Sequence, residues 1–121
     1  MNTKIELEYD GKSYTLEYDR MAVKMLESNN FNMDEFLSKP VTNIDLAFQG
    51  AFIKHHANVS LATINDIYNS CPDKTQLIVV IQQMISDTYE SLLADPEANT
   101  SKKATWKTVN LTPIKETKVT E

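Results

Sequence analysis

Residues 1–18 carry the pattern of a β-hairpin, and nothing after them clearly predicts another strand. Asp10-Gly11 is a dipeptide that a two-residue type I′ turn favours, because both central positions need a positive φ. The turn sets the expected strand pairs, which are Tyr9–Lys12, Leu7–Tyr14 and Ile5–Leu16. The expected apolar face holds Ile5, Leu7, Tyr9, Tyr14, Leu16 and Tyr18. The expected polar face holds Lys4, Glu6, Glu8, Ser13, Thr15 and Glu17, with Lys4 opposite Glu17. A lone hairpin is barely stable in water, so the apolar face must pack on the rest of the chain.

The remaining sequence predicts helices from apolar periodicity and capping residues. The expected ranges are about 20–28, a short helix from Asn32 that ends before Pro40, then about 44–56, 61–70 and 74–94. Asp19 and Ser60 are expected N-caps, and Asn32 with Glu35 and Asp73 with Gln76 form patterns like a capping box. Gly50 would lie inside a helix, which predicts a close crossing by a neighbouring element. In the last helix, Val79, Val80 and Tyr89 lie partly outside the apolar stripe.

These elements predict an α+β fold that is mainly α. The hairpin would pack on a small bundle of about four to five helices, and 121 residues suffice for one modest core. The body would span 1–95. Residues 96–121 are expected to form a flexible tail, because they are polar and have too few apolar groups for a core. Within the tail, segment 104–111 is expected to become a strand or an anchor when it is bound.

Charge and cysteine content narrow the class of protein. The net charge is −5, and residues 95–121 hold five lysines against four acidic residues, which leaves −6 on residues 1–94. An acidic body disfavours nucleic acid as the main partner, because phosphate contacts need clustered basic residues. Cys71 is the only cysteine, so reducing cytosol is the simplest compartment. The chain begins directly with the hairpin, which argues against a secretory signal, and no apolar run is long enough to span a membrane.

The candidate sites for chemistry have simpler structural explanations. Adjacent helical residues point about 100° apart, so His55 and His56 cannot easily share a metal ion, and His55 is expected to be packed with His56 exposed. Asp34-Glu35 lies in the first turn of a helix, where carboxylates favour the positive end of the dipole. The sequence therefore predicts no enzyme, no catalytic, cofactor-binding or metal-binding residue, and no cofactor.

Aromatic residues are the stronger signal, and most of them are expected in the core. An exposed remainder would indicate a partner surface. Trp106 in a polar tail is expected to dock on a partner, because Trp is a preferred interface anchor. The alternative is that the tail folds back on its own body. The expected partner-binding residues are Trp106, Val109, Leu111, Phe31 and Phe36.

Five short segments occur in an order that resembles a known family. They are Tyr9-Asp-Gly-Lys-Ser-Tyr14, Gly50-Ala-Phe-Ile-Lys-His-His56, Ile64-Asn-Asp-Ile-Tyr68, Pro72-Asp-Lys and Ala104-Thr-Trp106. Over about residues 1–110, the chain is similar to tail assembly chaperones of tailed phages and prophages of Gram-positive bacteria. The resemblance implies a non-enzymatic protein of the host cytoplasm that is absent from the mature virion. It also implies that the protein binds the tape measure protein and keeps it soluble until tail tube protein polymerises around it.

Two other functions agree with the same residues. One is a structural minor tail or connector protein of the virion, because a hairpin can add to a neighbouring sheet edge. The other is a small phage regulatory protein that binds a host factor. Self-association is a further expectation. Separately, many copies bound to one long partner would give avidity from individually weak contacts.

Overall fold

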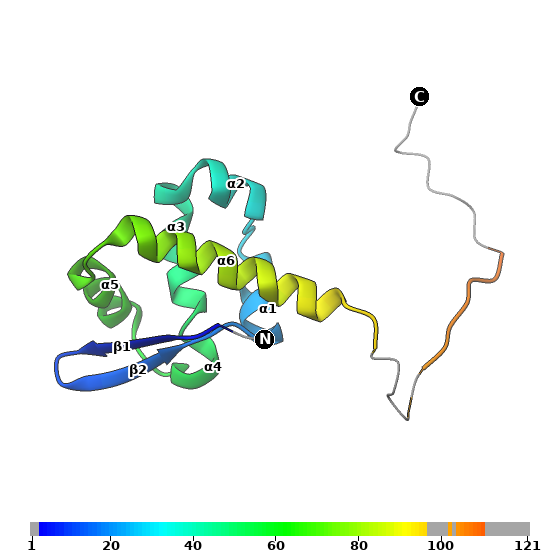
Figure 1. The fold of residues 1–121 in the computed structure, drawn as a ribbon, viewed down its shortest axis with the longest axis horizontal. Coiled ribbons are helices and arrows are strands. Elements are labelled where there is room, and N and C mark those ends of the chain that lie inside the picture. Colours follow the sequence, from blue (N-terminus) through cyan, green and yellow to red (C-terminus); the bar gives the residue numbers. More distant parts are fainter. Residues whose placement is uncertain (1–2, 97–101, 103, 111–121) are drawn as a thin grey trace.

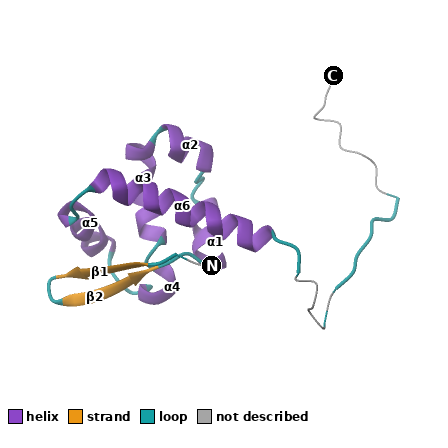
Figure 2. Cartoon of the chain, viewed as in Figure 1, coloured by secondary structure: helices purple, strands orange, loops and turns teal. Residues whose placement is uncertain are grey.

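The computed structural model describes residues 3–96, 102 and 104–110 of the chain. The elements in chain order are β1 (Ile5–Tyr9), β2 (Lys12–Leu16), α1 (Arg20–Ser28), α2 (Met33–Ser38), α3 (Pro40–Gly50), α4 (Ile53–His56), α5 (Leu61–Ser70) and α6 (Lys74–Leu93). Figures 1 and 2 show the hairpin along one side of a group of helices, with α6 crossing the body and residues 104–110 standing apart from it. The predicted α+β, mainly α fold is confirmed.

The hairpin has the predicted register. Asp10 and Gly11 have φ values of 53° and 77°, as the type I′ turn requires. Tyr14 and Leu16 of β2 are buried in the core, whereas the apolar residues of β1 are only half-buried. β2 is therefore the strand held against the helices, and β1 is the outer strand.

Glu17 contradicts the predicted polar face of the hairpin, because only 3% of it is exposed. β2 ends at Leu16, and the Glu17 N–H donates a hydrogen bond to the carbonyl oxygen of Ala51 at 3.1 Å. The alternation that would place Glu17 opposite Lys4 no longer applies once the chain has left the strand. Burial of this carboxylate therefore follows from the contact with the end of α3.

Three helices begin with the side-chain caps that the sequence indicates, and one does not. The capping side chains accept from a backbone N–H three residues on, in the pairs Asp19–Ala22, Asn32–Glu35 and Ser60–Thr63. Asp73 makes no such bond, and its backbone is left-handed at φ 52° and ψ 54°. The capping box predicted at Asp73 is therefore wrong.

The helix predicted over 44–56 is longer at its start and is interrupted. α3 begins at Pro40, where a missing N–H is tolerated, and ends at Gly50. A turn at residues 51–52 separates it from the single turn of α4, which gives six helical segments in the described residues. A Cβ on Gly50 would lie 3.1 Å from Cδ2 of Leu26, so the predicted close crossing at Gly50 is confirmed and α1 makes it.

One core joins the inner side of the hairpin to the helices. The Tyr18 hydroxyl donates to the carbonyl oxygen of Ala47, which ties the segment after β2 to the middle of α3. Phe48 packs edge-to-face on Phe52 with ring centroids 5.3 Å apart. The largest fully buried side chains are Phe36, Phe48, Phe52, Leu16, Leu26, Ile67, Ile81 and Ile85. The core leaves one flank of α6 and the outer edge of β1 at the surface.

Candidate partner-binding surface

One flank of α6 forms a stripe at the protein surface. Its members recur at alternating intervals of three and four residues, which places them on one side of a helix. They are Val79, Gln82, Ser86, Tyr89 and Leu93, called the α6 stripe below. Val79 is 51% exposed and Leu93 is 80% exposed, whereas the three residues between them are half-buried. An apolar residue at each end of a half-open stripe is the arrangement that a partner helix can cover.

A hollow of about 240 Å³ lies between the first half of the α6 stripe and α2. The Gln82 side chain donates to the carbonyl oxygen of Phe36 at 3.1 Å, which holds α2 beside α6. Leu37 is 58% exposed at its rim. The lining residues are Met33, Leu37, Val79, Gln82, Gln83 and Ser86. The hollow combines apolar and amide groups and carries no formal charge.

A second hollow, of about 310 Å³, lies between α1 and the last turns of α6. Tyr89 is 3.1 Å from Glu27 and donates its hydroxyl proton to that carboxylate, and burial raises the pKa of Tyr89. Arg20 and Lys24 add two positive charges to the lining. The lining residues are Arg20, Val23, Lys24, Glu27, Tyr89, Leu92 and Leu93. An apolar partner that carries acidic groups fits this end of the stripe.

The two hollows suit a helix better than a small molecule. Both use residues of the α6 stripe, so a partner can enter both while it follows one line on the surface. From Val79 to Leu93 that line is about 21 Å long at 1.5 Å per residue, which matches roughly four turns of a partner helix. Amphipathic helices bind such grooves through apolar anchors three and four residues apart.

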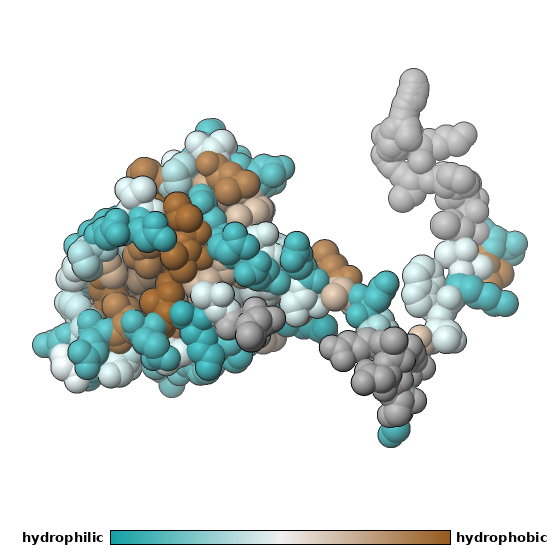
Figure 3. Space-filling model, in the orientation of Figure 1, coloured by the Kyte–Doolittle hydropathy of each residue, from teal (hydrophilic) through white to brown (hydrophobic). Residues whose placement is uncertain are grey.

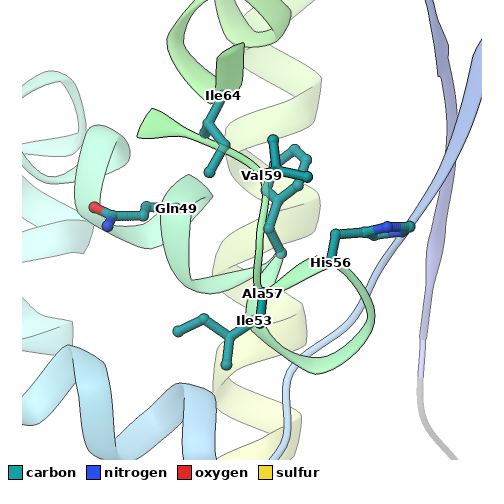
Figure 4. Close-up of a pocket in the computed structure, with 7 residues that line it drawn as sticks. Gln49, Ile53, His56, Ala57, Val59 and Ile64 are labelled. Atoms are coloured by element: carbon teal, nitrogen blue, oxygen red, sulfur yellow. The ribbon is translucent and has the colours of Figure 1, made fainter. Parts of the chain in front are cut away.

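A third hollow lies among α3, α4 and the start of α5, and it is small. Its volume is about 70 Å³, whereas ligand sites usually hold about 300–1,000 Å³. Its lining residues are Gln49, Phe52, Ile53, His56, Ala57, Val59 and Ile64. Figure 4 shows His56 pointing toward the hairpin and away from Gln49. This hollow has neither the size nor the converging polar groups of a substrate site.

The two histidines have structural roles, in the opposite order of burial from the prediction. His56 is half-buried against the rings of Tyr14 and Phe52, and its Nε2 accepts the Thr15 N–H at 2.9 Å. His55 is exposed, and its Nε2 lies 2.8 Å from Oε1 of Glu17. The prediction that His55 is packed and His56 exposed is therefore wrong, because His56 is the ring that accepts the Thr15 N–H at the edge of β2.

The Glu17 carboxylate is held by two groups from α4. Lys54 Nζ lies 3.2 Å from one of its oxygens and His55 Nε2 lies 2.8 Å from the other. The hydrogen bond with His55 lowers the pKa of Glu17, burial opposes that shift, and Lys54 lowers it further. The carboxylate is therefore ionised at neutral pH and pins α4 to the end of β2.

The described residues offer neither a metal site nor a membrane-spanning helix. Among residues 3–96, 102 and 104–110, no group of three or more His, Cys, Asp or Glu side chains is arranged to hold a metal ion. In that same part of the chain, no helix combines the length and apolar character needed to cross a membrane.

The residues predicted to bind a partner fall in three different places. Phe31 and Phe36 are only 8% and 0% exposed, and they pack edge-to-face at 5.6 Å within the core. They were expected to contact a partner, and their burial corrects that expectation. Trp106 and Val109 are 85% and 74% exposed. Leu111 lies outside the described residues.

The α6 stripe was not among the predicted contact residues, although the sequence held a signal for it. Val79 and Tyr89 lie partly outside the apolar stripe of the last helix, and a core-facing stripe alone does not explain them. These residues lie at the surface because α1 and α2 flank that side of α6 without covering it.

Comparison with known proteins gives one family. A protein-family model described as "Domain of unknown function (DUF5055)" matches residues 1–111. The chain matches no curated protein and no solved structure.

Proposed function

The chain belongs to that DUF5055 family, and we propose that it is a phage tail assembly chaperone that binds the tape measure protein. In this proposal it acts in the host cytoplasm, keeps the tape measure protein soluble, and promotes its enclosure by tail tube protein. The order of short segments that resembles tail assembly chaperones supports the proposal, and so does the α6 stripe.

The observation that carries the proposal is the pair of hollows along the α6 stripe. A tape measure protein is long and helical, so a chaperone for it needs a surface that accepts amphipathic helices of varied sequence. The hollow beside α2 offers exposed Leu37 and Val79 with neutral amides, which tolerate different apolar side chains. Such contacts are individually weak and would act through many copies on one partner.

Charge on the body supports the same role. Residues 1–94 carry a net charge of −6, which keeps complexes of many copies soluble through mutual repulsion. Arg20 and Lys24 lie at the α1 end of the stripe and attract acidic groups of the bound helix. The bound helix would therefore carry an apolar stripe and acidic residues near one end.

The proposal is tested by expressing the tape measure protein of the same phage genome with and without this chain. The chaperone should keep that protein in the soluble fraction and co-purify with it. Ser86→Lys, inside the α2 hollow, should weaken binding by about tenfold or more, because it places a flexible charge where apolar anchors dock.

Ser91→Lys is the matched control, because Ser91 is exposed on α6 and lines neither hollow. It should bind as the unmodified protein does. A tape measure protein that stays soluble without this chain would refute the proposal. Mass spectrometry of purified particles should find the chain absent, and stoichiometric presence would instead indicate a structural tail protein.

A further inference from the structure

The two edges of the hairpin differ in their hydrogen bonds. The outer edge of β2 is closed, because the Thr15 N–H donates to His56 and the Glu17 N–H donates to Ala51. In a hairpin with a two-residue turn, backbone groups of alternate residues on the other strand point away from its partner, and here they belong to Glu6 and Glu8. Within the described residues, these groups have no hydrogen-bond partner. β1 therefore presents an open strand edge.

The side chains along β1 define what can pair with it. Glu6 and Glu8 are exposed on one face, and the apolar residues Ile5, Leu7 and Tyr9 are half-buried on the other. Figure 3 shows apolar surface running from α6 down to the hairpin. A second β1 is a poor partner, because antiparallel pairing centred on Leu7 would set Glu6 opposite Glu8 of the other copy. The edge fits a strand that is apolar on one face and basic on the other.

The tail contains a segment with that pattern. In residues 104–109, Ala104, Trp106 and Thr108 alternate with Thr105, Lys107 and Val109. The segment has no proline, so each residue can donate its N–H to a neighbouring strand. All six residues are exposed, and Trp106 is 85% exposed. The segment is thus available to pair and carries its largest apolar group on the face without lysine.

We propose that residues 104–109 of one copy add to the open β1 edge of a second copy as an antiparallel strand. In the register that matches both faces, Lys107 lies opposite Glu6 and Trp106 lies opposite Leu7. The remaining pairs are Tyr9–Ala104, Glu8–Thr105, Ile5–Thr108 and Lys4–Val109. A shift by one residue would move Trp106 to the glutamate face and Lys107 to the apolar face, so both kinds of contact select the same register.

This pairing is head-to-tail, because each copy has one β1 edge and one tail segment. Two copies that exchange tails form a closed dimer, whereas pairing in one direction only leaves a free edge and a free tail at the two ends. Residues 104–110 stand apart from their own body in Figure 1 and do not cover their own β1 edge. The inference goes beyond the chaperone role and does not depend on the identity of the bound partner, because it concerns two copies of this chain alone.

The first experiment follows self-association by sedimentation velocity and the emission of Trp106, the single tryptophan. As concentration rises, the full chain should form larger species, and the emission should shift to shorter wavelength as Trp106 leaves water. Glu8→Pro should abolish both changes, because proline removes an N–H that points away from β2 and blocks strand addition. Ser13→Pro is the matched control on the other strand, and it should associate normally.

A second experiment exchanges the charges of one proposed pair. Glu6→Lys and Lys107→Glu should each weaken association by about three- to tenfold, because like charges would then lie opposite each other. The double variant should return to within about twofold of the unmodified chain. Recovery in the double variant would show that residues 6 and 107 lie opposite each other. Non-specific attraction between the two copies does not depend on this particular pair and would not predict recovery.

Three results would overturn the inference. Glu8→Pro that associates as the unmodified chain does would exclude the β1 edge. A monomer whose Trp106 emission is already shifted at every concentration would place the tail on its own body. If circular dichroism shows that Glu8→Pro does not fold, the test rests on the charge exchange between Glu6 and Lys107. Both residues are exposed, so their substitution should not affect folding. Failure of the double variant to recover would then reject the pairing.

Discussion

At the scale of single residues, Glu17 is buried by a tertiary contact although the strand alternation predicts that it faces solvent. Its carboxylate is almost completely buried, yet it is paired with Lys54 and His55, which are both about one-third exposed. A buried charge is tolerated when opposite charge and hydrogen bonds satisfy it. Glu17 thus joins β2 to α4, although its place in the sequence suggested a solvent-facing strand residue.

Glu17→Gln should lower the free energy of unfolding at neutral pH by about 1–2 kcal/mol, because the amide loses the charge-assisted bonds. The pKa of Glu17 is lower in the folded chain than its ordinary value of 4.5. The carboxylate therefore contributes stability above that value, and the contribution is lost as the pH falls below it toward the lowered pKa. Urea unfolding of both proteins across that range measures the effect.

The control is Glu8→Gln, because Glu8 is exposed on the hairpin and no salt bridge involves it within the described residues. Its stability should follow that of the unmodified protein at every pH. If the difference between Glu17→Gln and the unmodified protein stays constant down to about pH 3, the ion pair is not its source.

At the scale of elements, the link between α5 and α6 depends on backbone shape rather than on a cap. Asp73 holds a left-handed conformation at the start of α6. Lys74 Nζ donates to the carbonyl oxygens of Asn69 and Cys71 at 3.2 and 2.7 Å, which satisfies groups at the end of α5. The reversal between the two helices thus needs one residue with a positive φ.

Asp73→Val should lower the free energy of unfolding by about 1–2 kcal/mol, because a β-branched residue resists the left-handed region. Asp73→Gly should leave it unchanged or raise it slightly, because glycine adopts that conformation without steric cost. Thermal unfolding measures both effects. The alternative is that the Asp73 side chain acts as an N-cap. In that case Asp73→Ser should be as stable as the unmodified protein, and Asp73→Gly should be less stable.

At the scale of the whole molecule, the described tail residues contribute no contact to the core. Lys102 and residues 104–110 are exposed and lie in neither a helix nor a strand. Folding of the body should therefore not depend on these tail residues. Binding of a helical partner by the α6 stripe and pairing of copies by the tail would use different surfaces.

A chain that ends at Pro96 should unfold with a free energy within about 0.5 kcal/mol of the full chain, because it loses no described core contact. Denaturant titration at a concentration where both are monomeric measures this value. The shortened chain should also lose self-association while it still binds the tape measure protein. A loss of stability above about 1 kcal/mol would show that the tail packs on the body.

The hairpin and most helices could be predicted from the sequence because their signals are local. The Asp10-Gly11 turn and the period-two alternation set the strand register, and caps at Asp19, Asn32 and Ser60 set three helix starts. These features depend on the conformations of a few neighbouring residues. The chain by itself therefore determined the fold class, the apolar face of the hairpin and the exposed tail segment.

Tertiary structure decided the features that depend on contacts between distant residues. Glu17 is buried because the end of α3 and α4 lie beside it, and His56 rather than His55 is packed because Thr15 needs an acceptor. Phe31 and Phe36 entered the core, whereas the α6 stripe became the open surface because α1 and α2 flank it. Periodicity fixes which residues share a helix face, but only the neighbouring elements fix which faces are covered.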